Sequence, residues 1–520
     1  MESPQPSPPS PPPDPSTAAP PAAPGRGPAS RPSWTSRRPA LVSALRRYVG
    51  RAGGAPADAA VVGMESRRFL AKWVVLGGVI GVVAGVGAIV FSAAIELATH
   101  LFLGVIAGYV PPAPAGEGAT VVTPVLRPWL LPVVTTLGGL LSGIIVYGLA
   151  PEAQGHGTDA AIESFHHRGG RVRRRIPPVK LVASAITIGS GGSAGREGPT
   201  AQIASGFGSA LADWLHLSAA DRRIALATGM GAGIGAIFRA PLGGAMMAAE
   251  IMYRHDLEVE VLIPTLVASV VGYSVFGWWT GWSPVFGAQP DLAFTDPRQL
   301  VAYAGLGLLC GAVGILYSRV FYGAEHVFRR LPLPRVLRPA LGGLLVGLIG
   351  IRLPQALHTG YGWEQLGMDR EVVLGTSLAL VLLLPLAKIA TTALSIGSGG
   401  SGGIFGPGMV VGGLLGTAFW RLTQGRLPGV PSSPAPFVIV GMMALFGSIA
   451  HAPLAVMLMV GEMTGNLSLL APAMLALGLA TLLVGDETIY AAQLGTRVDS
   501  PAHRYRFSFP CWPASRCGRR

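Results

Sequence analysis

Long apolar runs set the strongest constraint on how this chain can fold. One begins at Trp73 (WVVLGGVIGVVAGVGAIVFSAAI), and others begin at Leu130, Leu300, Leu374 and Leu469. A helix that crosses the hydrocarbon core of a bilayer needs about 20 apolar residues. Some of these runs reach that length, and others are shorter or are interrupted by glycine and proline. Only 12% of the residues are charged, against about 25% in soluble domains. The sequence therefore predicts an all-α polytopic membrane protein.

Arginine is concentrated before the first run, in RVRRR at 171–175, and near the C-terminus. Nucleic-acid-binding proteins also carry such patches, but between membrane spans short Lys/Arg-rich loops mark the cytoplasmic side. We favour the membrane interpretation, which predicts no nucleic-acid partner. It places both termini and the 171–175 loop in the cytoplasm of a multi-pass protein of the cell (plasma or inner) membrane.

Composition divides the chain into three regions. The N-terminal region is rich in Pro, Ala and Arg and cannot bury a core, so we expect a disordered cytoplasmic arm. Met64, which follows it, is an alternative start. The expected boundaries are 1–63 for the arm, 64–494 for the membrane domain (with repeat halves at about 69–275 and 296–494), and 495–520 for a short cytoplasmic tail.

The cysteines give no sign of a metal site or a disulfide framework. Cys310 lies in an apolar run, and the other two, Cys511 and Cys517, are close to the C-terminus. These spacings match neither the paired spacing of zinc sites nor that of small disulfide-rich domains. We therefore expect no metal and no cofactor.

Two glycine-rich segments repeat each other. GSGGSAGREGP at 189–199 and GSGGSGGIFGP at 397–407 lie 208 residues apart and match at eight of eleven positions. A second pair, 229–250 and 441–462, lies 212 residues apart and aligns APL with APL and Glu250 with Glu462. Two motif pairs at nearly one offset indicate a duplicated half. In transporters, glycine-interrupted segments in matching positions of two halves point to the central binding site.

Backbone hydrogen bonding explains why such segments would mark a site. Within a bilayer, irregular backbone is tolerated only where it is buried in protein or lines a cavity. A helix that starts after such a loop directs its free N–H groups and its positive dipole end into that cavity, where they favour an anion. Two helix starts could hold a bare anion without a lysine. Arg196 and Glu197 are then exceptional, because charges at membrane depth are costly and by default functional.

At this point the motifs resemble those of a known family. GREGP at 195–199, GIFGP at 403–407 and the two APL…E segments are similar to motifs of the CLC family of chloride channels and chloride/proton exchangers. The resemblance runs from about Phe69 to Leu494. It implies an inverted-topology repeat whose broken helices meet at mid-membrane, and a homodimer with one pore per subunit. It implies transport of chloride or similar anions, in some members exchanged for protons, and no enzymatic activity. Many members carry C-terminal nucleotide-binding modules, which we do not expect here.

The resemblance assigns the gate to Glu197. Its carboxylate would occupy the anion site while ionised and leave it when protonated. The alternative is a structural ion pair with Arg196, but adjacent residues on a helix do not face each other. Arg196 then supports the loop or the local potential, and Gly195 belongs with it to the anion-binding loop.

The inner anion ligands are also implied by the resemblance. They are the backbone N–H groups of Ile404 and Phe405 and the hydroxyl of Tyr490. For Tyr490 the alternative is an ordinary interfacial tyrosine.

Two positions depart from the family pattern. His156, in GHGTD, stands where a serine hydroxyl usually meets the anion. It either donates to the anion or caps the following helix, and selectivity among chloride, nitrate and fluoride stays open. Ile251 stands at the inner proton position of many exchangers and cannot titrate. We therefore expect passive, channel-like conduction, with antiport through an unconventional inner proton path as the alternative. The neighbouring Glu250, like Glu462, is expected to have a structural role at a helix end.

Two rival functions receive little support from the sequence. Segments 189–194 and 397–402 fit the dinucleotide fingerprint, but no strand–turn–helix context surrounds either. The Pro-rich arm is the one feature that favours a receptor or scaffold.

Overall fold

The computed structural model describes residues 67–289, 292–427 and 429–504. Apart from three isolated bridges, these residues form helices and connections without a β-strand. The first half contains α2 (Arg67–Thr99), a π-helical turn (His100–Ala107), α3 (Leu131–Leu149), α4 (Thr158–His167), α5 (Ile176–Gly189), α6 (Glu197–Trp214), α7 (Ala219–Ile237), α8 (Pro241–Glu250) and α9 (Leu262–Thr280). The second half contains α10 (Gln299–Arg330), α11 (Arg338–Arg352), α12 (Tyr361–Leu366), α13 (Arg370–Gly375), α14 (Leu378–Gly397), α15 (Phe405–Thr423), α16 (Ala435–Ile449), α17 (Pro453–Thr464) and α18 (Leu470–Val484). The all-α fold is as predicted.

Five helical segments of the described residues are long and apolar enough to cross a membrane. They are Arg67–Ala107, Pro128–Leu149, Val259–Thr280, Gln299–Arg330 and Leu378–Gly397. The sequence analysis did not single out the third of these. The run from Leu469 forms α18, which has only 15 residues.

The run from Leu374 begins before its helix. Leu374 belongs to α13, and α14 starts at Leu378 because the hydroxyl of Ser377 accepts a hydrogen bond from the N–H of Leu380 and caps the new helix. A serine at this position is a strong helix-start signal.

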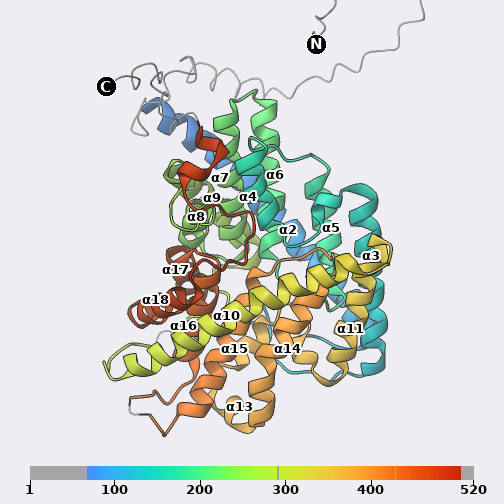
Figure 1. Cartoon of the computed structure of the whole chain (residues 1–520), viewed down its shortest axis with the longest axis vertical. Coiled ribbons are helices and arrows are strands. Elements are labelled where there is room, and N and C mark those ends of the chain that lie inside the picture. The colour runs from blue at the N-terminus through green and yellow to red at the C-terminus, as the bar shows by residue number, and fades with distance from the viewer. Residues whose placement is uncertain (1–66, 290–291, 428, 505–520) are drawn as a thin grey trace, which may run out of the picture.

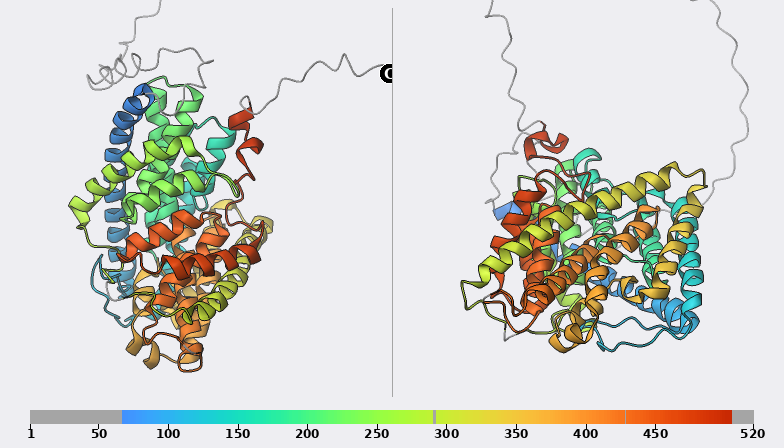
Figure 2. Two further views of the ribbon diagram at one scale, coloured as in Figure 1. Left: turned by 90° about the vertical axis from the view of Figure 1, so that its left-hand side faces the viewer. Right: turned by 60° about the horizontal axis from the view of Figure 1, so that its bottom comes forward.

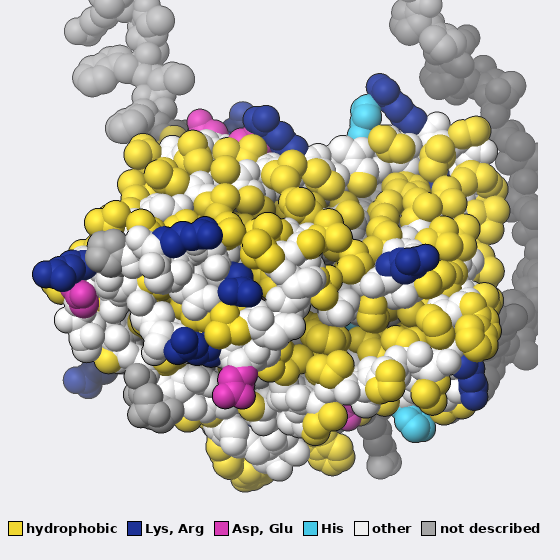
Figure 3. Space-filling model, turned by 90° about the horizontal axis from the view of Figure 1, so that it is seen from below, with side chains coloured by type: hydrophobic (Ala, Val, Ile, Leu, Met, Phe, Trp, Pro, Cys, Tyr) yellow, Lys and Arg dark blue, Asp and Glu magenta, His cyan; other side chains and the backbone are white. Residues whose placement is uncertain are grey.

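The two halves form neighbouring groups of helices. In the left view of Figure 2, most of the first-half helices lie above those of the second half, and α2 runs along one side of the molecule. Hydrophobic side chains cover much of the surface seen from below in Figure 3. Large apolar side chains such as Trp278, Val301 and Leu482 are exposed on apolar helices, as expected for a surface that faces lipid.

The duplicated motifs adopt the same backbone conformation. Both α5 and α14 end at the first glycine of their motif, and Gly191 and Gly399 take the left-handed φ values of 99° and 98°. Residues with a side chain rarely adopt this backbone conformation, so the turn that breaks each helix requires glycine. The next helices, α6 and α15, both begin at the ninth motif position.

Polar side chains join the two broken segments symmetrically. The hydroxyl of Ser193 lies 2.9 Å from that of Thr392, and the hydroxyl of Ser184 lies 2.9 Å from that of Ser401. In the repeat, Ser193 corresponds to Ser401 and Ser184 corresponds to Thr392, so the second contact is the first with the two halves exchanged. The internal repeat is therefore also a repeat of contacts between the halves.

The two motifs meet through their backbones. The Gly195 N–H donates to the Gly403 carbonyl at 2.8 Å, and the Gly403 N–H donates to the Gly195 carbonyl at 2.7 Å. A Cβ at Gly403 would lie 2.8 Å from the Gly195 carbonyl oxygen. Glycine is therefore needed for this approach, which places the starts of α6 and α15 side by side.

Glu250 and Glu462 each cap a helix of the other half. The Glu462 carboxylate accepts hydrogen bonds from the N–H groups of Leu242 and Gly243 at the start of α8. The Glu250 carboxylate accepts from Leu454 and Ala455 at the start of α17. A carboxylate at a helix N-terminus satisfies free donors and the helix dipole together. This reciprocal contact accounts for the helix-end role expected of the pair.

The segment after α18 returns across the membrane domain. His503 lies 2.7 Å from the buried Glu258 carboxylate, which also contacts Arg497 and Tyr253. Burial raises the pKa of the Glu258 carboxyl, but its contacts with His503 and Arg497 outweigh burial and lower that pKa below its usual value. Residues 495–504 of the expected tail are thus packed on the domain. The expected 1–63 arm and residues 505–520 lie outside the described residues.

Removing a reciprocal cap should destabilise the fold. We expect Glu462→Ala to lower the thermal unfolding midpoint of the detergent-solubilised protein by several degrees, because hydrogen bonds to a charged group are worth about 1.5–3 kcal/mol. Glu250→Ala should behave alike. Glu371→Ala, at an exposed position, is the matched control. Midpoints equal to that of the control would show that the caps do not stabilise the domain.

Candidate functional site

Glu197 lies at the point where the two halves meet. It is the first residue of α6 and is only 1% exposed. One carboxylate oxygen accepts a hydrogen bond from the Tyr361 hydroxyl, and the other accepts from the Gly406 N–H at 3.1 Å. Gly406 belongs to the first turn of α15. A carboxylate of the first half therefore occupies the positive N-terminus of a helix of the second half.

Arg196 does not form an ion pair with its neighbour. Its guanidinium pairs with Glu117 and lies 5.7 Å from the ring centroid of Tyr361. The alternative of a structural Arg196–Glu197 pair is therefore absent, and Arg196 holds the loop against the segment that follows α2.

Gly195 contributes through its lack of a side chain. A Cβ at this position would lie 2.0 Å from a Glu197 carboxylate oxygen. Its N–H already donates to the Gly403 carbonyl. Gly195 therefore allows the Glu197 carboxylate to fold back on the loop, and its N–H group is not free for an anion in this arrangement.

Ile404 and Phe405 form the start of α15. Their side chains are buried, and the Phe405 ring lies 4.2 Å from that of Phe446 and 5.2 Å from that of Phe238. The Tyr317 hydroxyl donates to the Ile404 carbonyl at 2.9 Å and holds the loop in place. The first N–H groups of a helix lack partners within it, so this start is suited to bind an anion.

His156 and Tyr490 face each other beside this helix start. Their ring centroids are 5.5 Å apart, and the Tyr490 ring also packs on Phe446. Tyr490 is fully buried and His156 is 7% exposed. Among the described residues, His156 Nδ1 has no hydrogen-bond partner, and the Tyr490 hydroxyl has the Thr158 side chain beside it without a hydrogen bond of good geometry. A buried and unpartnered polar atom beside a helix start indicates a ligand site.

The structure does not give His156 a capping role. The N-cap of α4 is Gly157, and no side chain caps this helix. The second alternative for His156 is therefore not realised, and its imidazole remains free to contact a ligand.

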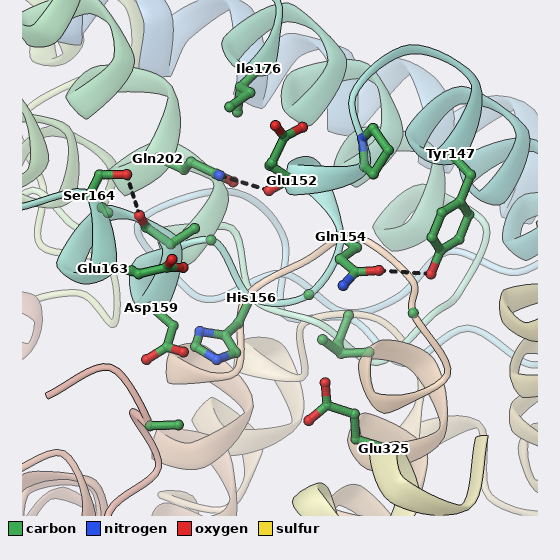
Figure 4. Close-up of a pocket in the computed structure, with 18 of the residues that line it drawn as sticks. Tyr147, Glu152, Gln154, His156, Asp159, Glu163, Ser164, Ile176, Gln202 and Glu325 are labelled. Atoms are coloured by element: carbon green, nitrogen blue, oxygen red, sulfur yellow. Dashed lines mark hydrogen bonds between the residues drawn. The ribbon is translucent and has the colours of Figure 1, made fainter. Parts of the chain in front are cut away.

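A pocket of about 1160 Å³ leads to His156. Figure 4 shows His156 beside Asp159, with Glu152, Gln154, Glu163 and Glu325 around them. Seven arginines line the pocket, namely Arg168, Arg171, Arg173, Arg174, Arg329, Arg335 and Arg338. The described residues contain no group of His, Cys, Asp and Glu suited to a metal ion.

Two buried lysines were missed in the sequence analysis. Lys180 Nζ donates to the carbonyls of Ala153 and Gly155, just before His156. Lys388 Nζ, 208 residues later, donates most closely to the His358 carbonyl, at 2.6 Å. Each lysine holds the loop that precedes a short helix. A single lysine at the same place in two repeated apolar runs was the available signal.

Ile251 lies at the end of α8 and is fully buried. The Gln493 side-chain amide donates to the carbonyls of Ile251 and Ala450. The position therefore has a structural role through its backbone, and its side chain cannot carry a proton.

Comparison with known proteins agrees with this geometry. The sequence model of the family described as "Voltage gated chloride channel" matches residues 138–485. A ClcB-like protein of Ralstonia nicotianae is 34% identical over 395 residues, which cover 74% of this chain and 90% of that protein. The H(+)/Cl(-) exchange transporter ClcA of Citrobacter koseri is 30% identical over 433 residues, which cover 80% of this chain and 86% of that protein.

Solved structures share the fold. The crystal structure of a slow cyanobacterial Cl-/H+ antiporter aligns with a TM-score of 0.70 at 24% identity, covering 80% of this chain and 96% of the other. A CLC-type fluoride/proton antiporter aligns with a TM-score of 0.68 at 21% identity, covering 83% and 99%. With these matches, the repeat and the paired helix starts described above, this chain belongs to the CLC family of voltage-gated chloride channels and transporters.

Proposed function

We propose that the protein transports chloride across the membrane in exchange for protons, with Glu197 as the gate. The observation that carries this proposal is the position of the Glu197 carboxylate at the N-terminus of α15. A chloride ion and an ionised carboxylate are both anions, so they compete for the same helix start. Protonation removes the charge of the carboxylate and with it the reason for occupying the site.

The inner part of the site supplies further donors to a chloride ion. We infer that the Tyr490 hydroxyl and His156, whose rings face each other, donate to the ion together with the start of α15 at Ile404 and Phe405. Arginines around the pocket raise the local anion concentration before binding. The two buried lysines, Lys180 and Lys388, add positive charge near the site without occupying it.

Exchange takes precedence over the passive conduction that Ile251 favoured. The ClcA proteins of Citrobacter koseri and Salmonella agona, 30% and 31% identical to this chain, are both named as H(+)/Cl(-) exchange transporters. We give the names of relatives with this degree of sequence identity more weight than the single non-titratable residue Ile251. Passive conduction becomes the alternative, and exchange requires an inner proton path that avoids the Ile251 side chain.

We infer the assembly and location from the family. A homodimer with one pore per subunit would lie in the cell membrane, with both termini in the cytoplasm. The arginine-lined pocket would then open to the cytoplasm, because 171–175 contributes to its lining. This orientation agrees with the rule that basic loops stay inside. Chloride and protons are the transported partners, and no catalysed covalent reaction is proposed.

The direct test of exchange is proton transport against a gradient. We expect an imposed chloride gradient across vesicles that contain the purified protein to drive protons uphill, because Glu197 couples the two ions. The measurement is the external pH while chloride flows. Chloride flow without uphill proton movement would establish passive conduction and overturn the exchange proposal.

Neutralising the gate should remove its pH response. Glu197→Gln keeps the shape of the protonated carboxyl, so we expect chloride flux in vesicles to persist and to become nearly independent of pH. Glu371→Gln, on the exposed face of α13, is the matched control. If the Glu197 variant retained the wild-type pH profile, the gate would have to be another residue.

Removing one inner donor should weaken chloride binding. Tyr490→Phe deletes the buried hydroxyl and leaves the start of α15 intact, and a hydrogen bond to an ion is worth about 1.5–3 kcal/mol. That is a loss of roughly tenfold or more in affinity, measurable by calorimetric titration. An unchanged affinity would remove the Tyr490 hydroxyl from the anion site.

A further inference from the structure

His156 is a titratable side chain between the pocket and the gate. It lines the pocket, and its ring contacts Tyr490 on the anion site. Its backbone carbonyl lies against the start of α6, where a Cβ at Gly198 would come within 2.0 Å of it. Gly198 directly follows Glu197. The loop that carries His156 is therefore in direct backbone contact with the helix start that carries the gate carboxylate.

The His156 imidazole can donate a hydrogen bond to an anion through one ring nitrogen and still accept a proton on the other. In a neutral imidazole one nitrogen carries a hydrogen and the other accepts. Nδ1 is buried and has no partner among the described residues. If Nδ1 donates to a chloride ion, the other nitrogen remains a base on a ring that lines the pocket.

The charges around His156 oppose an imidazolium in the absence of an anion. Lys180, on α5, reaches the loop before His156 and donates to the Gly155 carbonyl, and burial disfavours the charged ring. The acidic groups on this side of the pocket have other partners. Asp159 accepts from the Ala492 N–H, Glu163 pairs with Arg168, Glu152 pairs with Arg173, and Glu325 pairs with Arg329. The facing groups Gln202, Phe321 and Tyr490 carry no charge.

We propose that His156 binds a proton when chloride occupies the adjacent site and passes it to Glu197 when that chloride leaves toward the pocket. This deepens the exchange proposed above and rests on it. Chloride supplies the negative partner that the imidazolium otherwise does not have. By linkage, bound chloride then raises the affinity of His156 for a proton, and the proton raises the affinity of the site for chloride. When the chloride departs, the imidazolium becomes costly again. An N–H bond of His156 then breaks and an O–H bond of Glu197 forms, while a proton from the pocket later restores the ring.

The movement of charge in this step has the direction that exchange requires. Chloride moves away from the gate as the proton moves toward it. The step also explains why Ile251 does not prevent coupling: the group that titrates on the inner side lies in the anion path, 95 positions earlier in the sequence. His156 therefore serves both ions.

The first experiment measures proton uptake when chloride binds. Chloride or the large anion isethionate is added to purified Glu197→Gln protein in a weakly buffered detergent solution. The pH of this solution is set within the usual titration range of histidine. The Gln removes the gate carboxyl as a proton acceptor, so the remaining uptake reports other groups. We expect chloride, and not isethionate, to cause uptake, and we expect Glu197→Gln/His156→Asn to show several-fold less. Equal uptake in the two proteins would overturn the proposal.

The second experiment measures coupling in vesicles that contain otherwise wild-type protein. Asn keeps a polar group near Nδ1 but cannot titrate, so His156→Asn should lower the ratio of protons to chloride several-fold, with chloride flux reduced much less. If the His156→Asn protein does not fold, the same measurement is made on the His156→Ser protein. An unchanged ratio would show that His156 carries no proton. Failure of the wild-type protein to pump protons would instead refute exchange, while the uptake experiment would still test the chloride-linked proton on His156.

Discussion

The pair of backbone hydrogen bonds between Gly195 and Gly403 is the contact on which the rest of the structure depends. A helix broken inside a bilayer leaves backbone groups that lipid cannot satisfy. Here each broken segment satisfies the other, and the absence of side chains at both glycines permits the contact. Gly155 adds to it by accepting from the Gly402 N–H and donating to the Gly400 carbonyl. Neither loop is satisfied without its partner, so the two halves fix each other.

Competition at the anion site follows from this arrangement. The helix start that attracts an anion belongs to α15 in the second half, whereas the carboxylate that occupies it comes from Glu197 in the first. The reciprocal caps made by Glu250 and Glu462 tie the following helices together in the same crossed manner. A single half could provide either the helix start or the carboxylate. The proposed gating needs both, held in a fixed position relative to each other.

The sequence allowed the repeat, the broken helices and most of the site to be predicted. The nearly equal offsets of the glycine motifs and of the APL segments are a local pattern that indicated the repeat, and the family resemblance named Glu197, Phe405 and Tyr490 as site residues. The partners of these residues could not be predicted. Tyr361 reaches Glu197 across 164 positions, and Glu117 reaches Arg196 across 79.

Packing decides such contacts, and no spacing rule describes them. The start of α14 was not predicted, for a different reason. Hydropathy does not detect a helix boundary inside an apolar run, whereas the capping Ser377 marks it. The buried Lys180 and Lys388 were overlooked because single lysines in apolar runs are read as interruptions, although their equal spacing with the glycine motifs gave them a shared structural meaning.

The location of the titratable groups determines how tightly the two ions are coupled. If protons and chloride followed separate inner paths, they would interact only at Glu197. In this chain the inner position held by Ile251 is apolar, and the imidazole of His156 lies beside Tyr490, next to a loop that Lys180 holds. In the proposed exchange, a proton on His156 would be stabilised by the chloride ion with which it exchanges. Low-polarity surroundings make an isolated charge costly and strengthen the attraction between opposite charges. In the proposed exchange they would therefore make the binding of the proton and the binding of chloride depend on each other.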